Sequence, residues 1–380
     1  METRIENPFL VSGYESPAFF CDREKETADL LETLRNGRNV TLTSPRRIGK
    51  TGLIKHLFYT LKQQDPKAVV IYIDLFPTDN LAGFTHAFAS AVFGQLDSNP
   101  TKVLKTVASI FKGLRPHLTL DEVTGKPLIG LDIVKGTETY TLEQVFAYLK
   151  QSGKECFIAF DEFQQISHYP EQHVEALLRS YVQDLHQAHF IFSGSQVHML
   201  QEMFLSPKRP FYQSTSEITI GAIAEKPYYD FASEFFRRQG RVLPEEVFSE
   251  LYRRYEGFTW YIQMILNRIY AKSARTIDLD LVQECVLDIL KENDYYYQHL
   301  IRVYPKGQVK LIKAIALEKK VREITSGAFV AKYGLTATSS VKSALKRMLE
   351  EEIVYCSEEV YMVYDRFFGE WLDTTFSVNR

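Results

Sequence analysis

The chain has 380 residues, of which 45% are hydrophobic and 24% are charged, and its formal net charge is -3. This length exceeds what one hydrophobic core usually serves, so two or three domains are expected. A charge so close to neutral provides no global positive field. Any nucleic-acid contact would therefore need a local basic patch.

The sequence contains no evident targeting or membrane segment. The N-terminal METRIENPFL carries charges of both signs and no apolar core, unlike a signal peptide. No apolar run approaches the roughly 20 residues that span a bilayer. The four cysteines, Cys21, Cys156, Cys285 and Cys356, show neither disulfide-framework density nor metal-ligand spacing. We therefore expect a cytoplasmic protein without a membrane partner.

Short apolar runs alternate with helical periodicities from about residue 39 to residue 220, which predicts a parallel sheet covered on both faces. A helix over residues 51–62 follows the first run, and residues 118–134 resemble an inserted hairpin that turns at Thr124 and Gly125. The predicted parallel strands are NVTLTS, AVVIYIDLF, ECFIAFDE, HFIFSGS and EITIGAI.

The strand signal ends after Pro227. YYDFASEFFRRQG, PEEVFSELYRRYEG and TWYIQMILNRIYAKSA each have the pattern of an amphipathic helix. A last unit begins near Gly307, with helices expected over residues 308–319, 325–333 and 338–351, and then two strands in EIVYCSEEVYMVYD. The expected domains are a core over residues 1–224, a helical lid over 225–305 and a C-terminal domain over 306–380.

The stretch TLTSPRRIGKTGLI, residues 41–54, is close to a phosphate-binding loop. Gly49, Lys50 and Thr51 match that motif, whereas Ser44 replaces its first glycine. A loop between a strand and a helix points backbone N–H groups at a phosphate. Lys50 would reach the β- and γ-phosphates and Thr51 would bind Mg²⁺. The alternative is a chance Gly-Lys-Thr at a helix start. The residues expected at the nucleotide are Ser44, Pro45, Arg46, Arg47, Ile48, Gly49, Lys50, Thr51 and Gly52.

The strand CFIAFDEFQ ends in Asp161 and Glu162, as a Walker B strand does. The first acid would hold Mg²⁺, and the second would orient or deprotonate the attacking water. The alternative is a solvated pair of acids at a strand end. The spacing along the chain favours this strand and the loop strand as neighbours. A third strand ends in Ser193 and Ser195, which either sense the γ-phosphate or are ordinary polar residues at a strand end.

The motifs NPF, FFCDREKETADLL, TSPRRIGKTGLI, FIAFDEFQ and FSGSQ follow one another in this order. In this the chain resembles the archaeal-type AAA+ ATPases of the STAND group of P-loop NTPases. The resemblance covers nearly the whole chain and implies an α/β P-loop core, a helical lid and a C-terminal winged helix. It further implies ATP and Mg²⁺ as cofactors, with Asp22 and Arg23 near the adenine. The other implied roles are phosphate and Mg²⁺ binding by Lys50 and Thr51, Mg²⁺ binding by Asp161, catalysis by Glu162 and sensing by Ser195.

The chain departs from the family pattern at two places. Members often carry Tyr-Gly-Arg after the sensor strand, whereas Gln213 and Ser214 stand here, so a transition-state arginine would be absent unless Lys208 or Arg209 replaces it. A Gly-x-Pro lid motif appears as GFTWY, with Thr259 in place of proline. Both departures argue against fast hydrolysis. Arg46 and Arg47 would either supply positive charge to the site or form structural ion pairs.

In a winged helix, the helix over residues 338–351 would be the one that enters the major groove of DNA. Its exposed face would carry three cations, Lys342, Lys346 and Arg347, but several glutamates follow at once and would repel a DNA backbone. We therefore favour protein or intramolecular contacts for this helix over DNA.

Together these features predict an ATP-binding molecular switch with slow Mg²⁺-dependent hydrolysis that signals through the lid and the winged helix. ATP and ADP would be its ligands, and a protein partner or self-association would receive the signal. The alternative is an ATP-regulated DNA-binding regulator. A degenerate scaffold is disfavoured because Lys50, Thr51, Asp161 and Glu162 are all intact.

Overall fold

The computed structural model describes residues 6–96, 113–120, 127–272, 276–357 and 359–377. Its residues group into two compact units. The first consists of the N-terminal residues up to Phe9 together with Ala232–Glu256 and Tyr261–Arg380, and the second consists of Leu10–Phe231 with Gly257–Trp260. Among the described residues, no helix combines the length and the apolar character that crossing a bilayer requires.

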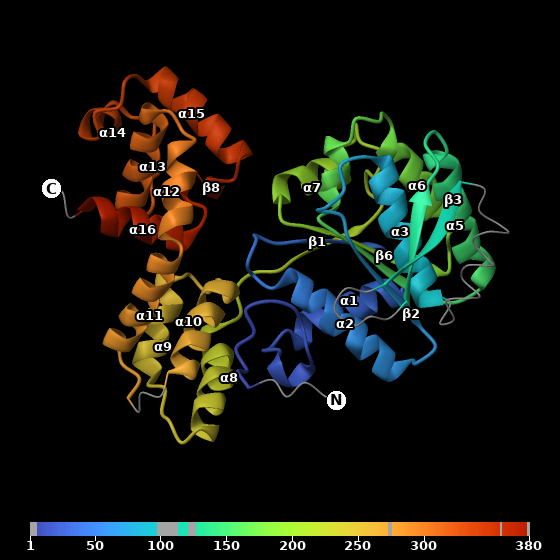
Figure 1. The fold of residues 1–380 in the computed structure, drawn as a ribbon, viewed down its shortest axis with the longest axis horizontal. Helices are drawn as coiled ribbons and strands as arrows, with labels where there is room; N and C mark the ends of the chain where they lie inside the picture. Colours follow the sequence, from blue (N-terminus) through green and yellow to red (C-terminus); the bar gives the residue numbers. More distant parts are fainter. Residues whose placement is uncertain (1–5, 97–112, 121–126, 273–275, 358, 378–380) are drawn as a thin grey trace. The chain divides into compact units, whose positions relative to one another are not determined.

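The second unit is built on a parallel sheet of five strands, which confirms the predicted α/β class (Figure 1). The strands follow in the order β2-β5-β6-β1-β7, and every neighbouring pair is parallel. Their bounds are Val40–Thr43 for β1, Val69–Asp74 for β2, Cys156–Asp161 for β5, Ala188–Gly194 for β6 and Ser216–Thr219 for β7.

Both faces of this sheet are buried. Along β5, Phe157 and Ala159 pack into one hydrophobic cluster, with α1 and α2, whereas Ile158 and Phe160 pack into the other, with α3, α5, α6 and α7 (Figure 1). Burial on both faces explains the unbroken apolar runs in the sequence. The helices are η1 Pro17–Phe19, α1 Glu24–Arg35, α2 Lys50–Gln64, α3 Leu81–Leu96, α5 Glu138–Ser152, η2 Phe163–His168, α6 Val174–Asp184 and α7 Val197–Leu205.

The expectation that the loop strand and the Asp-Glu strand are neighbours is wrong. Strand β6 lies between them, since it pairs with β1 on one side and β5 on the other. Separation along the chain does not determine which strands pair, because a crossover helix can carry the chain past an intervening position in a parallel sheet. The consequence for the site is that the carboxyl end of β6 lies between the two motifs.

The inserted hairpin is present as β3 Leu114–Leu120 and β4 Pro127–Ile133, which pair antiparallel with Leu120 opposite Pro127. Its expected turn at Thr124 and Gly125 lies outside the described residues.

The remaining elements follow the predicted order, with three helices, α11, α12 and α16, in addition. Strands β8 and β9 follow α15 in the chain and form an antiparallel pair, as a winged helix requires. The bounds are α8 Glu225–Arg238, α9 Glu245–Arg254, α10 Thr259–Ala271, α11 Leu279–Glu292, α12 Asp294–Arg302, α13 Lys306–Glu318, α14 Gly327–Lys332, α15 Thr338–Glu350, β8 Val354–Ser357, β9 Val360–Val363 and α16 Arg366–Ser377.

Candidate functional site

The loop between β1 and α2 has the strand–turn–helix form that the sequence motif requires. Gly49 is the N-cap of α2 and has φ 103°, a conformation that favours glycine. Arg47 is also left-handed, at φ 69°. Ser44 is not among the residues with positive φ, and its hydroxyl donates to the Pro45 carbonyl. A serine can therefore replace the first glycine because the backbone there does not need glycine's freedom.

The first two residues of α2 meet the first acid of β5. The Lys50 ammonium lies 2.7 Å from Asp161 Oδ1, and the Thr51 hydroxyl donates to Asp161 Oδ2 at 2.7 Å. Lys50 and Asp161 are only 6% and 3% exposed. The two motifs that the sequence analysis singled out therefore converge in one buried ionic cluster.

Two more hydroxyls donate to Asp161, one from each neighbouring strand. Tyr72 on β2 donates to Oδ2 at 2.8 Å, and Ser193 on β6 donates to Oδ1 at 2.5 Å. Burial by itself would raise the pKa of the Asp161 carboxyl. The Lys50 ammonium and the hydrogen bonds outweigh burial and hold this pKa well below its usual range. Asp161 is accordingly an anion.

The second acid lies farther from Lys50, whose ammonium is 3.5 Å from Glu162 Oε1, and its other partners are different. Glu162 has φ 53°, and its Oε2 accepts hydrogen bonds from the Ser195 hydroxyl at 2.9 Å, the Ser195 backbone N–H at 3.2 Å and the Gln164 amide at 2.5 Å. Arg46 Nε donates in turn to the Ser195 hydroxyl at 3.1 Å. Ser195, Glu162 and Arg46 thus form a second network beside the first.

The oxygen donors of the first cluster fit a magnesium ion. Mg²⁺ usually binds through one or two protein oxygens together with substrate phosphates and water. Thr51 and Asp161 offer two such oxygens within hydrogen-bonding distance of each other. A cage of three or more histidine, cysteine, aspartate or glutamate side chains does not occur in the described part of the chain. The donor set therefore suits an ion that arrives with a phosphate ligand.

An aromatic cluster lies against the first turn of α2. Phe20 stacks on His56 with ring centroids 4.4 Å apart, and the Tyr14 hydroxyl lies 3.0 Å from His56 Nδ1. A Cβ added at Gly52 would stand 3.3 Å from the Phe20 ring. The segment expected near the adenine therefore does reach the helix that carries Lys50.

Within this segment, Asp22 and Arg23 both have positive φ, at 57° and 79°. Arg23 is 4% exposed, and its guanidinium donates to the Gly221 carbonyl and to Glu26. The bond to Gly221 connects the segment to the residues that follow β7. The proposed adenine contact of Asp22 and Arg23 stays a prediction.

The segment Gly257–Trp260 belongs to the same compact unit as the phosphate-binding loop. The Thr259 hydroxyl donates to the Ile48 carbonyl at 3.0 Å, and the backbone N–H of Trp260 donates to the Arg47 carbonyl at 3.0 Å. The Arg47 guanidinium stacks over the Trp260 ring, 4.3 Å from its centroid. The residues at the start of α10 therefore bind the loop main chain directly.

The structure also describes the departures from the family pattern. Gln213, which stands where the pattern has glycine, adopts φ 52° and so keeps a glycine-like conformation. Arg209, a possible substitute for the missing arginine, forms an ion pair with Glu175.

The cations of α15 are partly neutralised. Arg347 pairs with Glu351 at 2.7 Å, and Lys346 lies 3.9 Å from Glu350. Lys342 has no ion pair within the described residues. Glu350 at the end of this helix and Glu351 after it therefore lie beside two of the three cations that DNA would need.

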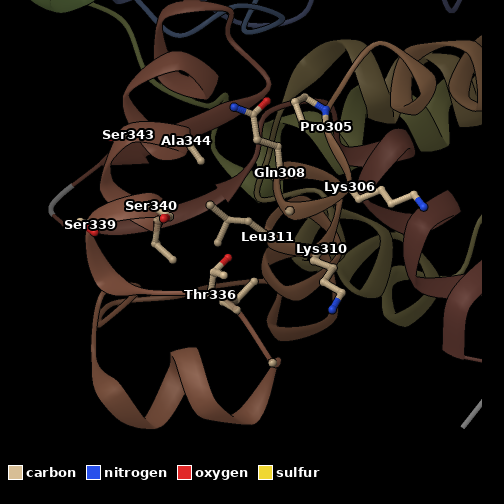
Figure 2. Close-up of a pocket in the computed structure, with 14 residues that line it drawn as sticks. Pro305, Lys306, Gln308, Lys310, Leu311, Thr336, Ser339, Ser340, Ser343 and Ala344 are labelled. Carbon is tan, nitrogen blue, oxygen red and sulfur yellow. The ribbon is translucent and has the colours of Figure 1, made fainter.

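A groove of about 700 Å³ opens beside α15 (Figure 2). Lys306 and Lys310 of α13 line one side, and the hydroxyl side chains of Ser339, Ser340 and Ser343 line the other. The DNA-binding face expected from the sequence has Lys342, Lys346 and Arg347 and does not include these two lysines.

Sequence reasoning missed Tyr72, Gln164 and Trp260 as members of the site. Gln164 lies in the same FDEFQ stretch as the acids, and its polarity after an apolar strand was an available signal. Tyr72 lies inside an apolar strand where a tyrosine is ordinary, so no local pattern marks it.

Comparison with known protein families identifies an ATPase domain and a winged helix domain in the chain. A model described as "ATPase domain predominantly from Archaea" matches residues 20–265, and one described as "Probable winged helix domain" matches residues 295–374. A search of curated proteins finds no match.

Several solved structures share the fold. The Walker-type ATPase PABY2304 of Pyrococcus abyssi has a TM-score of 0.67 and 17% identity, with 96% of this chain and 99% of that chain covered. The Aeropyrum pernix ORC2 protein, solved in ADPNP and ADP complexes, has a TM-score of 0.57 and 14% identity over 99% and 98%. The Aeropyrum pernix ORC1 protein in complex with DNA has a TM-score of 0.55 and 14% identity over 98% of each chain. At these identities the likeness concerns the fold.

Proposed function

The chain belongs to the family of ATPase domains found predominantly in Archaea, and we propose that it is a Mg·ATP-dependent molecular switch with slow hydrolysis. One observation carries the proposal: at the carboxyl end of a parallel sheet, the Lys50 ammonium and the Thr51 hydroxyl each lie 2.7 Å from a carboxylate oxygen of Asp161. Ligands of open α/β sheets bind at this edge.

In the proposed complex, the loop N–H groups and Lys50 bind the phosphates, and Thr51 and Asp161 hold the magnesium ion. Mg²⁺ would supply charge neutralisation of the phosphate oxygens. Binding therefore separates the Lys50 ammonium from Asp161, since the phosphates need it. Glu162 would orient the attacking water and accept its proton. The donors from Ser195 and Gln164 all go to Oε2, so Oε1, 3.5 Å from the Lys50 ammonium, is the oxygen that would meet the water. Slow turnover is supported by Gln213 and Ser214, which stand where the family pattern has Gly-Arg.

The segment Gly257–Trp260 supports a switch. Thr259 and Trp260 donate to carbonyls of the phosphate-binding loop, so a change in the loop alters these bonds. A nucleotide shifts such an equilibrium only through contacts that differ between the two states. The signal would pass from the loop to α10, and from there to a protein partner or a second copy of the chain.

The test is a titration of the purified protein with a fluorescent ATP analogue, with and without Mg²⁺, in parent and variants. Lys50→Ala should weaken binding by roughly 100-fold, since a hydrogen bond to a charged group contributes about 1.5–3 kcal/mol. Lys55→Ala is the matched control, one turn further along α2, and should bind as the parent does.

Circular dichroism must show that Lys50→Ala is folded, because Asp161 then lacks its buried partner. A folded Lys50→Ala protein that binds Mg·ATP as tightly as the parent contradicts the proposal.

The second candidate is an ATP-regulated DNA-binding protein. The groove in Figure 2 favours it, because two further lysines, Lys306 and Lys310, line it from α13, opposite the serines of α15. The glutamates paired with Lys346 and Arg347 count against it. Of the two candidates, the switch without a DNA target is the one we favour.

A further inference from the structure

Strand register explains how a tyrosine from β2 reaches the site. Tyr72 lies opposite Ala159 in the parallel pair of β2 and β5. Residues two apart on a strand face the same side of the sheet, so Ala159 and Asp161 share a face with Tyr72. The alanine is small, and the long tyrosine side chain extends along this face to place its hydroxyl 2.8 Å from Asp161 Oδ2.

The donors to Asp161 divide into two groups. In the proposed function, Lys50 and Thr51 contact phosphate and Mg²⁺ once nucleotide is bound. Tyr72 and Ser193 contact neither, so they can keep their hydrogen bonds to Asp161. They hold opposite oxygens of the carboxylate, Oδ2 and Oδ1, from the two strands that flank β5.

Tyr72 can only donate to this carboxylate. An ionised carboxylate only accepts hydrogen bonds, so the phenol O–H is the donor of this pair. Lys55 lies over the other part of the side chain, 5.3 Å from the ring centroid.

We propose that Tyr72 is a positioning residue for magnesium, which orients the Asp161 carboxylate toward the ion after Lys50 and Thr51 have turned to the nucleotide. The inference rests on the proposed function. Hydrogen bonds to a metal-binding carboxylate fix its orientation, and their loss typically weakens metal affinity by 10- to 100-fold.

The experiment compares Tyr72→Phe with the parent protein. A fluorescent ATP analogue is held at a fixed concentration while MgCl₂ is titrated, and its affinity is measured separately in EDTA. Tyr72→Phe should raise the Mg²⁺ midpoint by roughly 10-fold and leave the EDTA affinity unchanged. Phenylalanine keeps the ring and its contact with Lys55, so the variant should fold. Tyr59→Phe, an exposed tyrosine on α2, is the control and should match the parent.

An unchanged Mg²⁺ midpoint in Tyr72→Phe overturns the inference while leaving the proposed function intact. An equal loss of affinity with and without Mg²⁺, together with a lower melting temperature, assigns Tyr72 a purely structural role and also overturns it. A parent protein that binds no nucleotide in either condition removes the proposed function, and the inference falls with it.

Discussion

The two adjacent acids of the site share the Lys50 ammonium, which lies 2.7 Å from Asp161 and 3.5 Å from Glu162, but their other hydrogen-bond partners differ and suit different roles. Asp161 receives the ammonium and three hydroxyls, which keep it charged and fixed. Glu162 turns away at φ 53° toward Ser195 and Gln164. Strand β5 ends at Asp161, whereas Glu162 has a left-handed backbone and begins the turn of η2. Asp161 is therefore suited to bind a cation, and Glu162 is suited to orient and deprotonate a water molecule.

This division predicts the effects of two substitutions. Glu162→Gln should keep ATP bound and lower turnover by at least about 100-fold, since a general base contributes about 10²- to 10⁴-fold and an amide cannot take a proton. Asp161→Ala should instead weaken the Mg²⁺-dependent part of binding. Phosphate release and nucleotide titration measure the two effects. Parental turnover in Glu162→Gln would mean that another group is the base.

At the scale of elements, the aromatic cluster beside α2 links the N-terminal segment to the phosphate-binding helix. Burial raises the pKa of Tyr14 to about 12, so its hydroxyl stays protonated where it lies 3.0 Å from His56 Nδ1. Burial also lowers the pKa of His56 below its ordinary value, since the charged ring would lose solvation.

The lowered pKa predicts a pH-dependent stability. An unfolded histidine gains its proton near pH 6.5, whereas folded His56 gains it at lower pH. The contribution of neutral His56 to the free energy of unfolding is therefore fully present above about pH 6.5, and it is lost as the pH falls from that value toward the pKa of folded His56. His56→Gln should flatten the denaturant-measured stability between about pH 5 and 7. His198→Gln, at an exposed position on α7, is the control. An identical slope in His56→Gln and the parent would refute this origin.

The segment that joins α9 to α10 offers a direct probe of the phosphate-binding loop. Trp260 donates to Arg47 and stacks with it, and Trp371 is the other of the two tryptophans in the chain. In a Trp371→Phe background, Mg·ATP should change the emission of Trp260, because the loop carbonyls and Arg47 form its surroundings. The same titration with Lys50→Ala should give no change. Saturating nucleotide with unaltered emission would argue against coupling through this segment.

At the scale of the whole molecule, an ATPase domain and a winged helix domain share one chain. The three domains expected from the sequence, over residues 1–224, 225–305 and 306–380, stay a prediction. What the winged helix contacts depends on its surface charge, and α15 has two of its three cations beside glutamates.

This charge pattern predicts weak DNA binding without sequence preference that is lost at physiological salt. DNA affinity falls as the salt concentration rises, and it falls more steeply the more phosphates the protein contacts. Few cations of α15 are free to make such contacts, so the affinity should be low from the start. Replacing Lys342, Lys346 and Arg347 with alanine should leave ATP affinity unchanged and alter protease sensitivity near residues 300–310 with and without ATP. Fluorescence anisotropy with duplex DNA measures binding. Tight, sequence-selective binding at physiological salt that the triple variant abolishes would favour the regulator.

The sequence by itself determined the elements and the two motifs of the site. Apolar runs predicted the five parallel strands because burial on both faces needs apolar residues throughout. Gly49, Lys50 and Thr51 at a helix start, and Asp161 at a strand end, follow from local chemistry. Such features are readable because each depends on residues close together in the chain.

Only the tertiary structure decided which strands are neighbours and which side chains complete the site. It put β6, not β1, beside β5, and this brought Ser193 to Asp161. Register between β2 and β5 brought Tyr72 to the same carboxylate, and the fold brought Trp260 to Arg47. These contacts join residues far apart in the chain. Their geometry comes from how helices and strands pack, and a local pattern carries no record of that packing.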